Sequence, residues 1–495
     1  MSRRVACAIL ALLPTCAAIA AETALGPIGN TLLHNSVAGA NQFGYGSTTG
    51  DVDNDGVSDL IIAPNGTNSL RILRGNAWDV GAGGALIKFF GTTFQPGVGI
   101  RSHTVITGDF DGDGRDEIAF GNPSYSVAVP SGGRAYVARR DTSNGSWDIA
   151  TTIQQEVNGY PGVHEASDSF GYALAAGDFD ADGYDDLAIG SHGEDVGSTN
   201  EAGAVMITYG TASGITSARS SLITRNSDGL GFTPMEDDRY GFALTSGDFD
   251  ADGYADLAIG ATGARCPDGT TRAGAVIVMY GSAGGIVNTR SRIFRPGVSM
   301  LQGSCTNGTQ FGSDLVAAGF DSGLTTDLAV GTYTNAVHVV YASANGLETA
   351  GNQRFTPADI PGVSAASRFG TRLAAGRLRR LSAGLVFGRT SLAIGAPDDT
   401  VNGISQAGSV IILHAAADGL TAAGAERWSR SAARTVGAPA VDDRYGSSLT
   451  IGDYNDDGVQ DLAIGVPYYD DGATVDDGAV EVLYGSGFIF RDGFQ

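Results

Sequence analysis

A nine-residue acidic segment recurs five times along the chain, and each copy lies between two short apolar runs. The copies span residues 51–59, 109–117, 178–186, 248–256 and 453–461 (DVDNDGVSD, DFDGDGRDE, DFDADGYDD, DFDADGYAD and DYNDDGVQD). Glycine stands at position 6 of all five, and four copies carry acidic side chains at positions 1, 3, 5 and 9. Chains use this spacing to wrap oxygen ligands around Ca²⁺. Five copies predict a repeat architecture that contains metal ions.

Each acidic segment belongs to a longer repeat. The unit opens with an aromatic-glycine pair and continues through the acidic segment to an apolar run such as Asp186-Leu-Ala-Ile-Gly190. A glycine-rich run that ends in Tyr-Gly follows, as in residues 202–210. The opening pairs are Phe43-Gly44, Phe170-Gly171, Tyr240-Gly241, Phe311-Gly312, Phe369-Gly370 and Tyr445-Gly446, and the second unit has lost its pair near Arg101-Ser102. Alignment of these features gives seven units.

Short apolar runs separated by glycine-rich turns indicate an all-β protein with four antiparallel strands per unit. Seven such units arranged radially predict a seven-bladed β-propeller over residues 28–485, in which stacked blades cover each other's faces. The last unit lacks its fourth strand, because only residues 486–495 follow Gly485. Residues 28–37 (IGNTLLHNSV) resemble an outer strand without a blade. We therefore expect the N-terminal segment to complete blade seven and close the ring.

The two ends of the chain carry their own signals. A basic start, an apolar run over residues 5–19 and small residues at Ala18 and Ala20 predict a signal peptide over residues 1–20. The alternatives are a membrane anchor, for which the run is short, and lipidation at Cys16. We expect a secreted protein, extracellular or periplasmic, without a transmembrane segment, and association with the cell surface is an alternative. The tail 486–495 contains three Phe and is either a docking segment or a sorting signal.

Charge and cysteine content narrow the classes further. The formal net charge of −24 argues against nucleic acid or anionic lipid as a partner. Loss of the signal peptide removes Cys7 and Cys16 and leaves Cys266 and Cys305. In an oxidising compartment these two are expected to form a disulfide, and two unpaired buried thiols are the alternative.

The combination of an aromatic-glycine pair, DxDxDGxxDLAIG and a Gly-Ala-Val run that ends in Tyr-Gly resembles the FG-GAP repeat. This repeat builds the N-terminal propeller of integrin α subunits and of bacterial relatives. The resemblance covers residues 28–485. It implies that each acidic loop joins the two innermost strands of its blade on one face. It also implies that partners bind the opposite face, where blade-to-blade connections lie.

Both the chemistry and the resemblance assign five Ca²⁺ sites, in blades one, two, three, four and seven. Positions 1, 3, 5 and 9 are expected to give side-chain oxygens, and position 7 its backbone carbonyl. The ligands are Asp51, Asp53, Asp55, Val57 and Asp59; Asp109, Asp111, Asp113, Arg115 and Glu117; Asp178, Asp180, Asp182, Tyr184 and Asp186; Asp248, Asp250, Asp252, Tyr254 and Asp256; and Asp453, Asn455, Asp457, Val459 and Asp461. Asn455 predicts that the last site is the weakest. Residues 319–327 and 376–391, in blades five and six, are expected not to bind.

Metal-free acidic turns are the alternative for these loops, although four like charges within one turn repel each other. We expect the Ca²⁺ to be mainly structural. The sequence contains no G-x-S-x-G, H-E-x-x-H, P-loop or dinucleotide motif, so no enzyme is predicted. The expected function is that of a monomeric protein-recognition or adhesion module with a protein or glycan ligand. A lectin and a polysaccharide-cleaving enzyme are the alternatives. Acidic residues before the aromatic-glycine pairs, such as Asp168, are interpreted as packing turns or as a binding rim.

Overall fold

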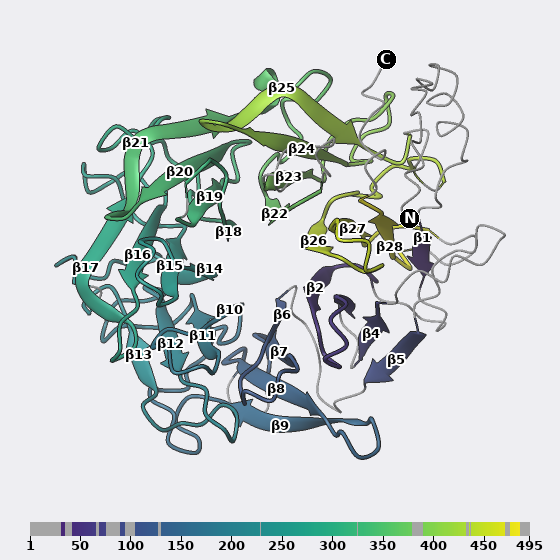
Figure 1. Cartoon of the computed structure of the whole chain (residues 1–495). Coiled ribbons are helices and arrows are strands. Elements are labelled where there is room, and N and C mark those ends of the chain that lie inside the picture. The colour runs from purple at the N-terminus through teal and green to yellow at the C-terminus, as the bar shows by residue number, and fades with distance from the viewer. Residues whose placement is uncertain are drawn as a thin grey trace, which may run out of the picture.

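Seven four-stranded antiparallel sheets, here called blades, stand in a ring around a central opening in the computed structural model (Figure 1). The structure describes residues 31–34, 42–65, 69–75, 90–94, 104–126, 130–227, 229–323, 325–378, 390–431, 435, 437–470 and 476–485. Within these ranges the helical content is one short 3-10 helix, η1 (Pro357–Asp359). No helix in the described ranges is long and apolar enough to span a membrane. The predicted all-β, seven-bladed β-propeller is confirmed.

Four consecutive strands build each of the first six blades. They are β2–β5 (Gly46–Gly50, Asp59–Ala63, Leu70–Arg74, Phe90–Phe94), β6–β9 (Val105–Gly108, Glu117–Asn122, Arg134–Arg140, Trp147–Ile153), β10–β13 (Ala173–Gly177, Asp186–Ser191, Ala204–Thr208, Ser221–Ile223), β14–β17 (Tyr240–Gly247, Asp256–Ala261, Ala275–Tyr280, Val287–Phe294), β18–β21 (Leu315–Ala318, Asp327–Gly331, Val337–Ser343, Gly346–Phe355) and β22–β25 (Arg372–Gly376, Ser391–Ala396, Ser409–Ala416, Gly419–Trp428). Blade seven contains β26 (Ser448–Gly452), β27 (Asp461–Val466), β28 (Ala479–Leu483) and β1 (Thr31–His34).

The N-terminal strand closes the ring, as predicted from the missing fourth strand of the last unit. Strand β1 pairs antiparallel with β28, from Thr31 opposite Val482 to His34 opposite Ala479 (Figure 1). The partly buried Leu32 and Leu33 pack against a core shared by blades six, seven and one. Residues 1–30, 35–41 and 486–495 lie outside the described residues, so the predicted signal peptide and tail stay predictions.

The second strand of each blade is buried because neighbouring blades cover both of its faces. All residues of β3, β11 and β15 are buried, including the glycines. A strand with two covered faces needs a continuous apolar run instead of an alternating one. This requirement explains the repeated Leu-Ala-Ile-Gly sequence.

Aromatic-glycine pairs join each blade to the preceding one. Phe170 of blade three is fully buried and forms a backbone bridge with Gly133 of blade two. The glycine that ends the Leu-Ala-Ile-Gly run is also needed where its blade packs against the following one. A Cβ atom added to Gly190 would lie 2.1 Å from the carbonyl oxygen of Gly241 in blade four, too close for any side chain.

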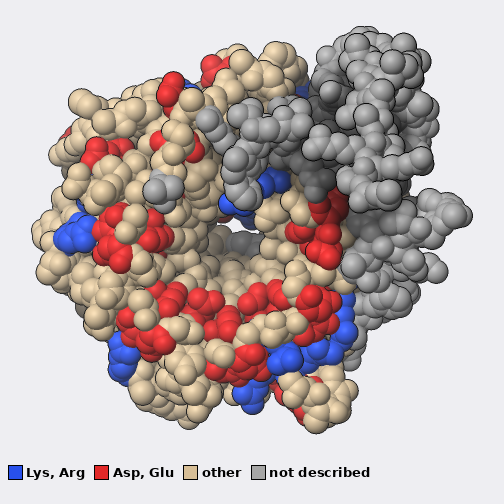
Figure 2. Space-filling model, viewed as in Figure 1, with Lys and Arg blue, Asp and Glu red and all other residues tan. Residues whose placement is uncertain are grey.

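The strand order gives the ring two different faces. In each blade the first strand is innermost (Figure 1), and in blade one it ends at Gly50, directly before the acidic loop. The second strand returns to the opposite side, where the loops between second and third strands and the connections between blades lie. We call the two sides the acidic-loop face and the connection face. Figure 2 shows one face of the ring, with acidic side chains gathered around the central opening and many basic ones farther out.

Candidate metal centres and the opposite face

The acidic segments form the loops between the first and second strands of blades one, two, three, four and seven. In blades one to four, carboxylate oxygens from positions 1, 3 and 9 lie within 4.8 Å of one another. The groups are Asp51, Asp53 and Asp59; Asp109, Asp111 and Glu117; Asp178, Asp180 and Asp186; and Asp248, Asp250 and Asp256. Three clustered carboxylates are a suitable start for a hard divalent cation, which takes six to eight oxygen ligands.

The first aspartate shapes the loop through its own backbone contacts. Asp178 Oδ1 accepts a hydrogen bond from the Asp182 N–H (3.0 Å), and Oδ2 accepts one from the Gly183 N–H (2.9 Å). Gly183 has φ 92°, a left-handed conformation that favours glycine. The same two bonds occur in the other four acidic loops. Aspartate at position 1 and glycine at position 6 therefore fix the turn.

The closing carboxylate fastens the loop to the third strand. Asp186 Oδ2 accepts the Phe179 N–H (2.8 Å), and Oδ1 accepts the Gly210 N–H (2.9 Å) just after β12. Both bonds recur at Asp59, Asp256, Asp327 and Asp461, and Glu117 keeps the first of them. Sequence reasoning missed this second role. The signal was Asp327, which blade five retains although its loop has lost the first aspartate.

Position 3 provides the observation that tests whether a cation fits. Oδ1 atoms of Asp53, Asp180 and Asp250 are buried and have no hydrogen-bond partner in the protein. Asp180 and Asp250 are only 8% and 5% exposed. A buried carboxylate oxygen without a partner costs free energy, which a coordinated cation offsets. The residues present therefore fit a Ca²⁺ ion at these loops.

An arginine pairs with the other oxygen of position 3 in blades one to four. The pairs are Arg74–Asp53 (3.1 Å), Arg139–Asp111 (3.1 Å), Arg219–Asp180 (2.7 Å) and Arg290–Asp250. Arg219 and Arg290 also lie over the rings of Tyr209 and Tyr280, at 4.3 and 4.7 Å from the ring centres. These arginines come from different strands and turns, so no sequence motif announces them.

We expect Arg290→Gln to strengthen Ca²⁺ binding in blade four by about two- to fivefold, because the guanidinium beside Asp250 repels a second cation. The effect is small since the Arg290 side chain is 49% exposed and screened by water. Calcium titration of the purified variant measures it. Arg292→Gln is the matched control, because Arg292 in the same strand donates to the backbone carbonyls of Leu347 and Asn345. Equal affinity changes in both variants would contradict the prediction.

Positions 5 and 7 lie outside the clusters that the structure brings together. Asp182 is exposed, and its Oδ1 accepts the Tyr184 N–H (3.1 Å). The same bond from position 7 to position 5 occurs in the other loops. The ligand roles of these ten residues stay predictions: Asp55, Val57, Asp113, Arg115, Asp182, Tyr184, Asp252, Tyr254, Asp457 and Val459.

The loops of blades six and seven differ from the acidic pattern of blades one to four. In blade seven the buried Asn455 Oδ1 accepts the Asp457 N–H (3.1 Å), and its Nδ2 has no partner. One charge fewer at this position supports the expectation of a weaker site. In blade six, residues 379–389 lie outside the described residues, so the prediction that this loop does not bind Ca²⁺ is untested.

Burial raises the pKa of every closing carboxylate, and neighbouring loop carboxylates add to the effect. The pKa rises to about 7 for Asp59, Asp186 and Asp256 and to about 8 for Glu117 and Asp461. In blade five, which has fewer acidic neighbours, burial raises the pKa of Asp327 only to about 6. A bound cation favours the charged form and acts against this rise. Without one, the charged loops destabilise the fold at neutral pH.

Backbone hydrogen bonds link each loop to the loop of the preceding blade. The Asp116 N–H donates to the Asp51 carbonyl, and the Asp185 N–H donates to the Asp109 carbonyl, both at 3.0 Å. Ser58 bonds to Asp453, Ala255 to Asp178, and Thr326 to Asp248 in the same way. Successive loops are therefore in direct backbone contact around this face.

The connection face carries the disulfide and the exposed apolar side chains. Cys266, between β15 and β16, and Cys305, between β17 and β18, are joined by a disulfide with Cα atoms 6.0 Å apart. On the described surface, the exposed large hydrophobic residues all lie in blade connections or second-to-third-strand loops. They are Val157, Val163, Phe232, Met235, Met300, Tyr333 and Val441. None of these seven lies in an acidic loop.

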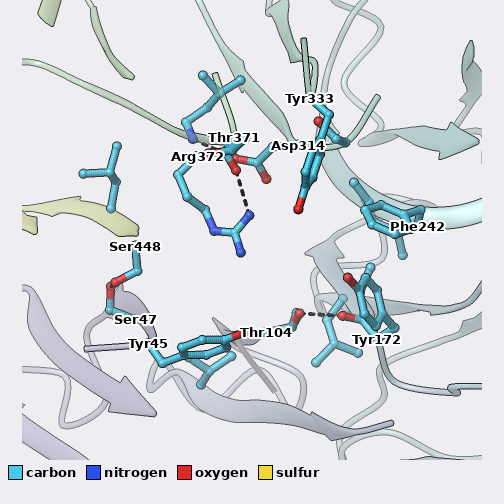
Figure 3. Close-up of a pocket in the computed structure, with 18 residues that line it drawn as sticks. Tyr45, Ser47, Thr104, Tyr172, Phe242, Asp314, Tyr333, Thr371, Arg372 and Ser448 are labelled. Atoms are coloured by element: carbon cyan, nitrogen blue, oxygen red, sulfur yellow. Dashed lines mark hydrogen bonds between the residues drawn. The ribbon is translucent and has the colours of Figure 1, made fainter. Parts of the chain in front are cut away.

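A cavity of about 300 Å³ lies where the innermost strands begin, at the connection-face end of the central opening. Residues near the start of the innermost strand, or directly before it, line the cavity in all seven blades. Figure 3 shows Tyr45, Tyr172, Phe242 and Tyr333 around the cavity, with the Arg372 guanidinium extending into it. Sequence reasoning missed this pocket, because its residues come from separate blades.

Two backbone carbonyls hold Arg372 in this cavity. Its Nε–H donates to the Ser447 carbonyl (3.1 Å), and Nη1 donates to the Thr371 carbonyl (2.7 Å). Asp314 accepts the Leu373 N–H (2.7 Å). Burial raises the pKa of Asp314 to about 6, although the Arg372 charge acts in the opposite direction. The cavity thus presents a guanidinium and aromatic side chains beside an acid with a raised pKa.

Comparison with known protein families identifies the same repeats that build the blades. The FG-GAP repeat family matches residues 103–138, 170–207, 240–279 and 445–483, and the FG-GAP-like repeat family matches residues 51–120. These matches fall on blades one, two, three, four and seven, which carry the acidic loops. The fold and the repeats together define an FG-GAP β-propeller.

Three proteins of known name are similar to this chain in sequence. Integrin alpha-PS2 of Drosophila melanogaster is 32% identical over 240 residues, 47% of this chain and 15% of that protein. Integrin alpha-5 of Xenopus laevis is 28% identical over 233 residues (45% and 20%). Phosphatidylinositol-glycan-specific phospholipase D of Bos taurus is 35% identical over 117 residues (22% and 14%). The chain is thus a β-propeller with FG-GAP repeats that is similar to integrin α subunits, and it spans a fifth or less of the length of these relatives.

Proposed function

We propose that this chain is a secreted, Ca²⁺-stabilised propeller that recognises a protein partner through its connection face. Its relation to integrin α chains supports a role in protein recognition or adhesion. The predicted signal peptide supports export. The four carboxylate clusters, three of which contain a buried position 3 oxygen without a hydrogen-bond partner among the described residues, support Ca²⁺ as the resident ion.

One observation carries the choice of face. The exposed large hydrophobic residues of the described surface gather on the connection face, and Met300 (76%), Val441 (63%) and Val163 (52%) are the most exposed. These side chains belong to several blade connections, and a partner that spans the ring on this face would cover them. The acidic loops occupy the other face, where burial of charge would oppose association. Calcium therefore has a structural role at a distance from the partner.

The central cavity adds specificity to this interface. Its ring of aromatic side chains offers apolar contact area, and the Arg372 guanidinium offers N–H donors to a partner's acceptor groups. Because the cavity lies on the same face as the exposed apolar loops, one partner can contact both.

The double variant Met300→Asp, Val441→Asp is expected to weaken partner binding at least tenfold, about 1.4 kcal/mol. Binding of wild type and variant to an array of extracellular matrix proteins in Ca²⁺ measures the change. The control is Thr142→Asp, Ala212→Asp, which adds the same charges to exposed turns between third and fourth strands, on the acidic-loop side. Equal loss in both variants, or selective binding to glycans, would overturn the proposal.

The phospholipase match does not favour an enzyme for this chain. It covers 117 residues and 14% of that protein. The shared segment is therefore explained by the repeats that this chain and the phospholipase have in common, and turnover by the purified chain is the observation that would restore the enzyme alternative.

A further inference from the structure

Three buried oxygen-bearing side chains converge on the connection face, between blades two and three. Gln155 and Asp168 are 0% exposed and Glu194 is 4% exposed. Gln155 Nε2 donates a hydrogen bond to Glu194 Oε2 at 2.6 Å, and Asp168 Oδ2 accepts the Glu165 N–H at 2.6 Å. Gln155 Oε1 and Asp168 Oδ1 are buried and have no hydrogen-bond partner in the protein. This group therefore contains acceptors that no protein donor satisfies.

Neighbouring carboxylates add to the negative charge of this group. Glu165 and Asp195 raise the pKa of Asp168, after burial, to about 6. Burial, Asp168 and the same two residues raise the pKa of Glu194 to about 8. Two buried carboxyl groups without a cation are costly to keep charged.

Two other blade junctions carry a different side chain at the position of Gln155. Gln155 stands two residues after the end of β9, and arginine stands two residues after the ends of β13 and β25. The arginines, Arg225 and Arg430, face Asp238 at 3.8 Å and Asp443 at 2.8 Å. Asp168, Asp238 and Asp443 each lie two residues before the aromatic of an aromatic-glycine pair. The junction before blade three has thus lost the cationic side chain that its equivalents contain.

The same junction has also gained an acid. Glu194 lies four residues after the glycine of the Leu-Ala-Ile-Gly run, where blade four has Ala264 and blade seven has Tyr469. The three residues at the junction before blade three carry a formal charge of −2, whereas both equivalent sets are neutral. Within one chain, the same backbone arrangement therefore occurs with and without an internal cation.

We propose that a Ca²⁺ ion binds between blades two and three, with Gln155 Oε1, Asp168 Oδ1 and the Glu194 carboxylate as protein ligands. Carboxylate and amide oxygens are hard donors that suit Ca²⁺, and two positive charges balance the two carboxylates. The ion replaces the arginine of the other two junctions and fastens the connection after β9 to blade three. This site lies on the face opposite the acidic loops and does not depend on them.

Glu194→Gln tests the proposal, because the outcome depends on whether a cation is present. Bound calcium is counted by atomic emission after dialysis against calcium, and melting temperatures are measured in Ca²⁺ and in EDTA. We expect one Ca²⁺ fewer per chain than wild type, and a calcium-induced rise in melting temperature that is smaller by roughly 2 to 4 °C. The contrary result is an unchanged calcium count, with the variant melting above wild type by the same amount in Ca²⁺ and in EDTA. It would show that Glu194 is uncharged in the wild type and would overturn the proposal.

Gln155→Arg supplies the missing cation from within the chain. We expect this variant also to bind one Ca²⁺ fewer and to melt above wild type in EDTA. Arg225→Gln is the reciprocal control at the junction before blade four, where Ala264 stands at the position of Glu194. It is expected to lower the melting temperature equally in both buffers with an unchanged calcium count. Because each result is a difference from wild type, failure of the acidic loops to bind Ca²⁺ would not obscure it.

Discussion

Removal of Ca²⁺ is expected to lower the melting temperature of this propeller by roughly 10 to 20 °C. Each acidic loop that binds Ca²⁺ with a dissociation constant of about 10⁻⁴ M gains about 2 kcal/mol in about 2 mM Ca²⁺. Five such loops together gain roughly 9 kcal/mol, which is comparable to the whole stability of an ordinary domain. Backbone bonds between successive loops, such as Asp116 N–H to the Asp51 carbonyl, should make the loss cooperative. Thermal melts followed by circular dichroism in Ca²⁺ and in EDTA measure the effect.

Single substitutions separate the cation from the shape of the loop. Asp250→Asn removes the charge at a buried position 3 whose Oδ1 has no partner, and is expected to reduce the calcium-dependent part of the stability. Asp321→Asn is the matched control in the blade five loop, where Asp321 accepts the Gly323 N–H and no carboxylate cluster occurs among the described residues. Equal melting temperatures of wild type in Ca²⁺ and EDTA would show that the loops fold without a cation.

Deletion of residues 22–40 is expected to open the ring. Without β1, the edge of β28 is exposed to pairing with other chains. Leu32 and Leu33 also lose their contacts with the core shared by blades six, seven and one. From these two partly buried side chains and the lost pairing we expect a destabilisation of roughly 3 kcal/mol. Thermal melts and size-exclusion chromatography should show a lower melting temperature and aggregation.

The control for this deletion removes residues 22–27 alone and leaves the strand in place. A peptide of residues 28–37, added to the deleted protein, is expected to restore part of the lost stability by pairing with β28. An unchanged melting temperature after deletion of residues 22–40 would show that blade seven is stable with three strands.

Features that repeat locally could be predicted from the sequence. The acidic spacing of residues 178–186 predicts a turn, because Asp178 and Gly183 act within one loop. The Leu-Ala-Ile-Gly run predicts a strand covered on both faces, and the missing last strand predicts closure by the N-terminus. Each inference depends on residues close together in the chain or on the count of units. In blades one to four the carboxylates at positions 1, 3 and 9 lie together and position 5 lies outside these groups, and the ligand roles at every position stay predictions.

The sequence by itself determined the repeat, the propeller, the closing strand and the acidic loops, since their patterns recur with fixed spacing. Only the tertiary structure decided which distant side chains meet. It placed Arg290 on Asp250, Arg372 in a cavity bounded by all seven blades, and Glu194 beside Gln155. The side chains that meet in each case are separated by tens of residues in the sequence and belong to no common motif. They depend on how closely neighbouring blades pack, which is set by the ring as a whole.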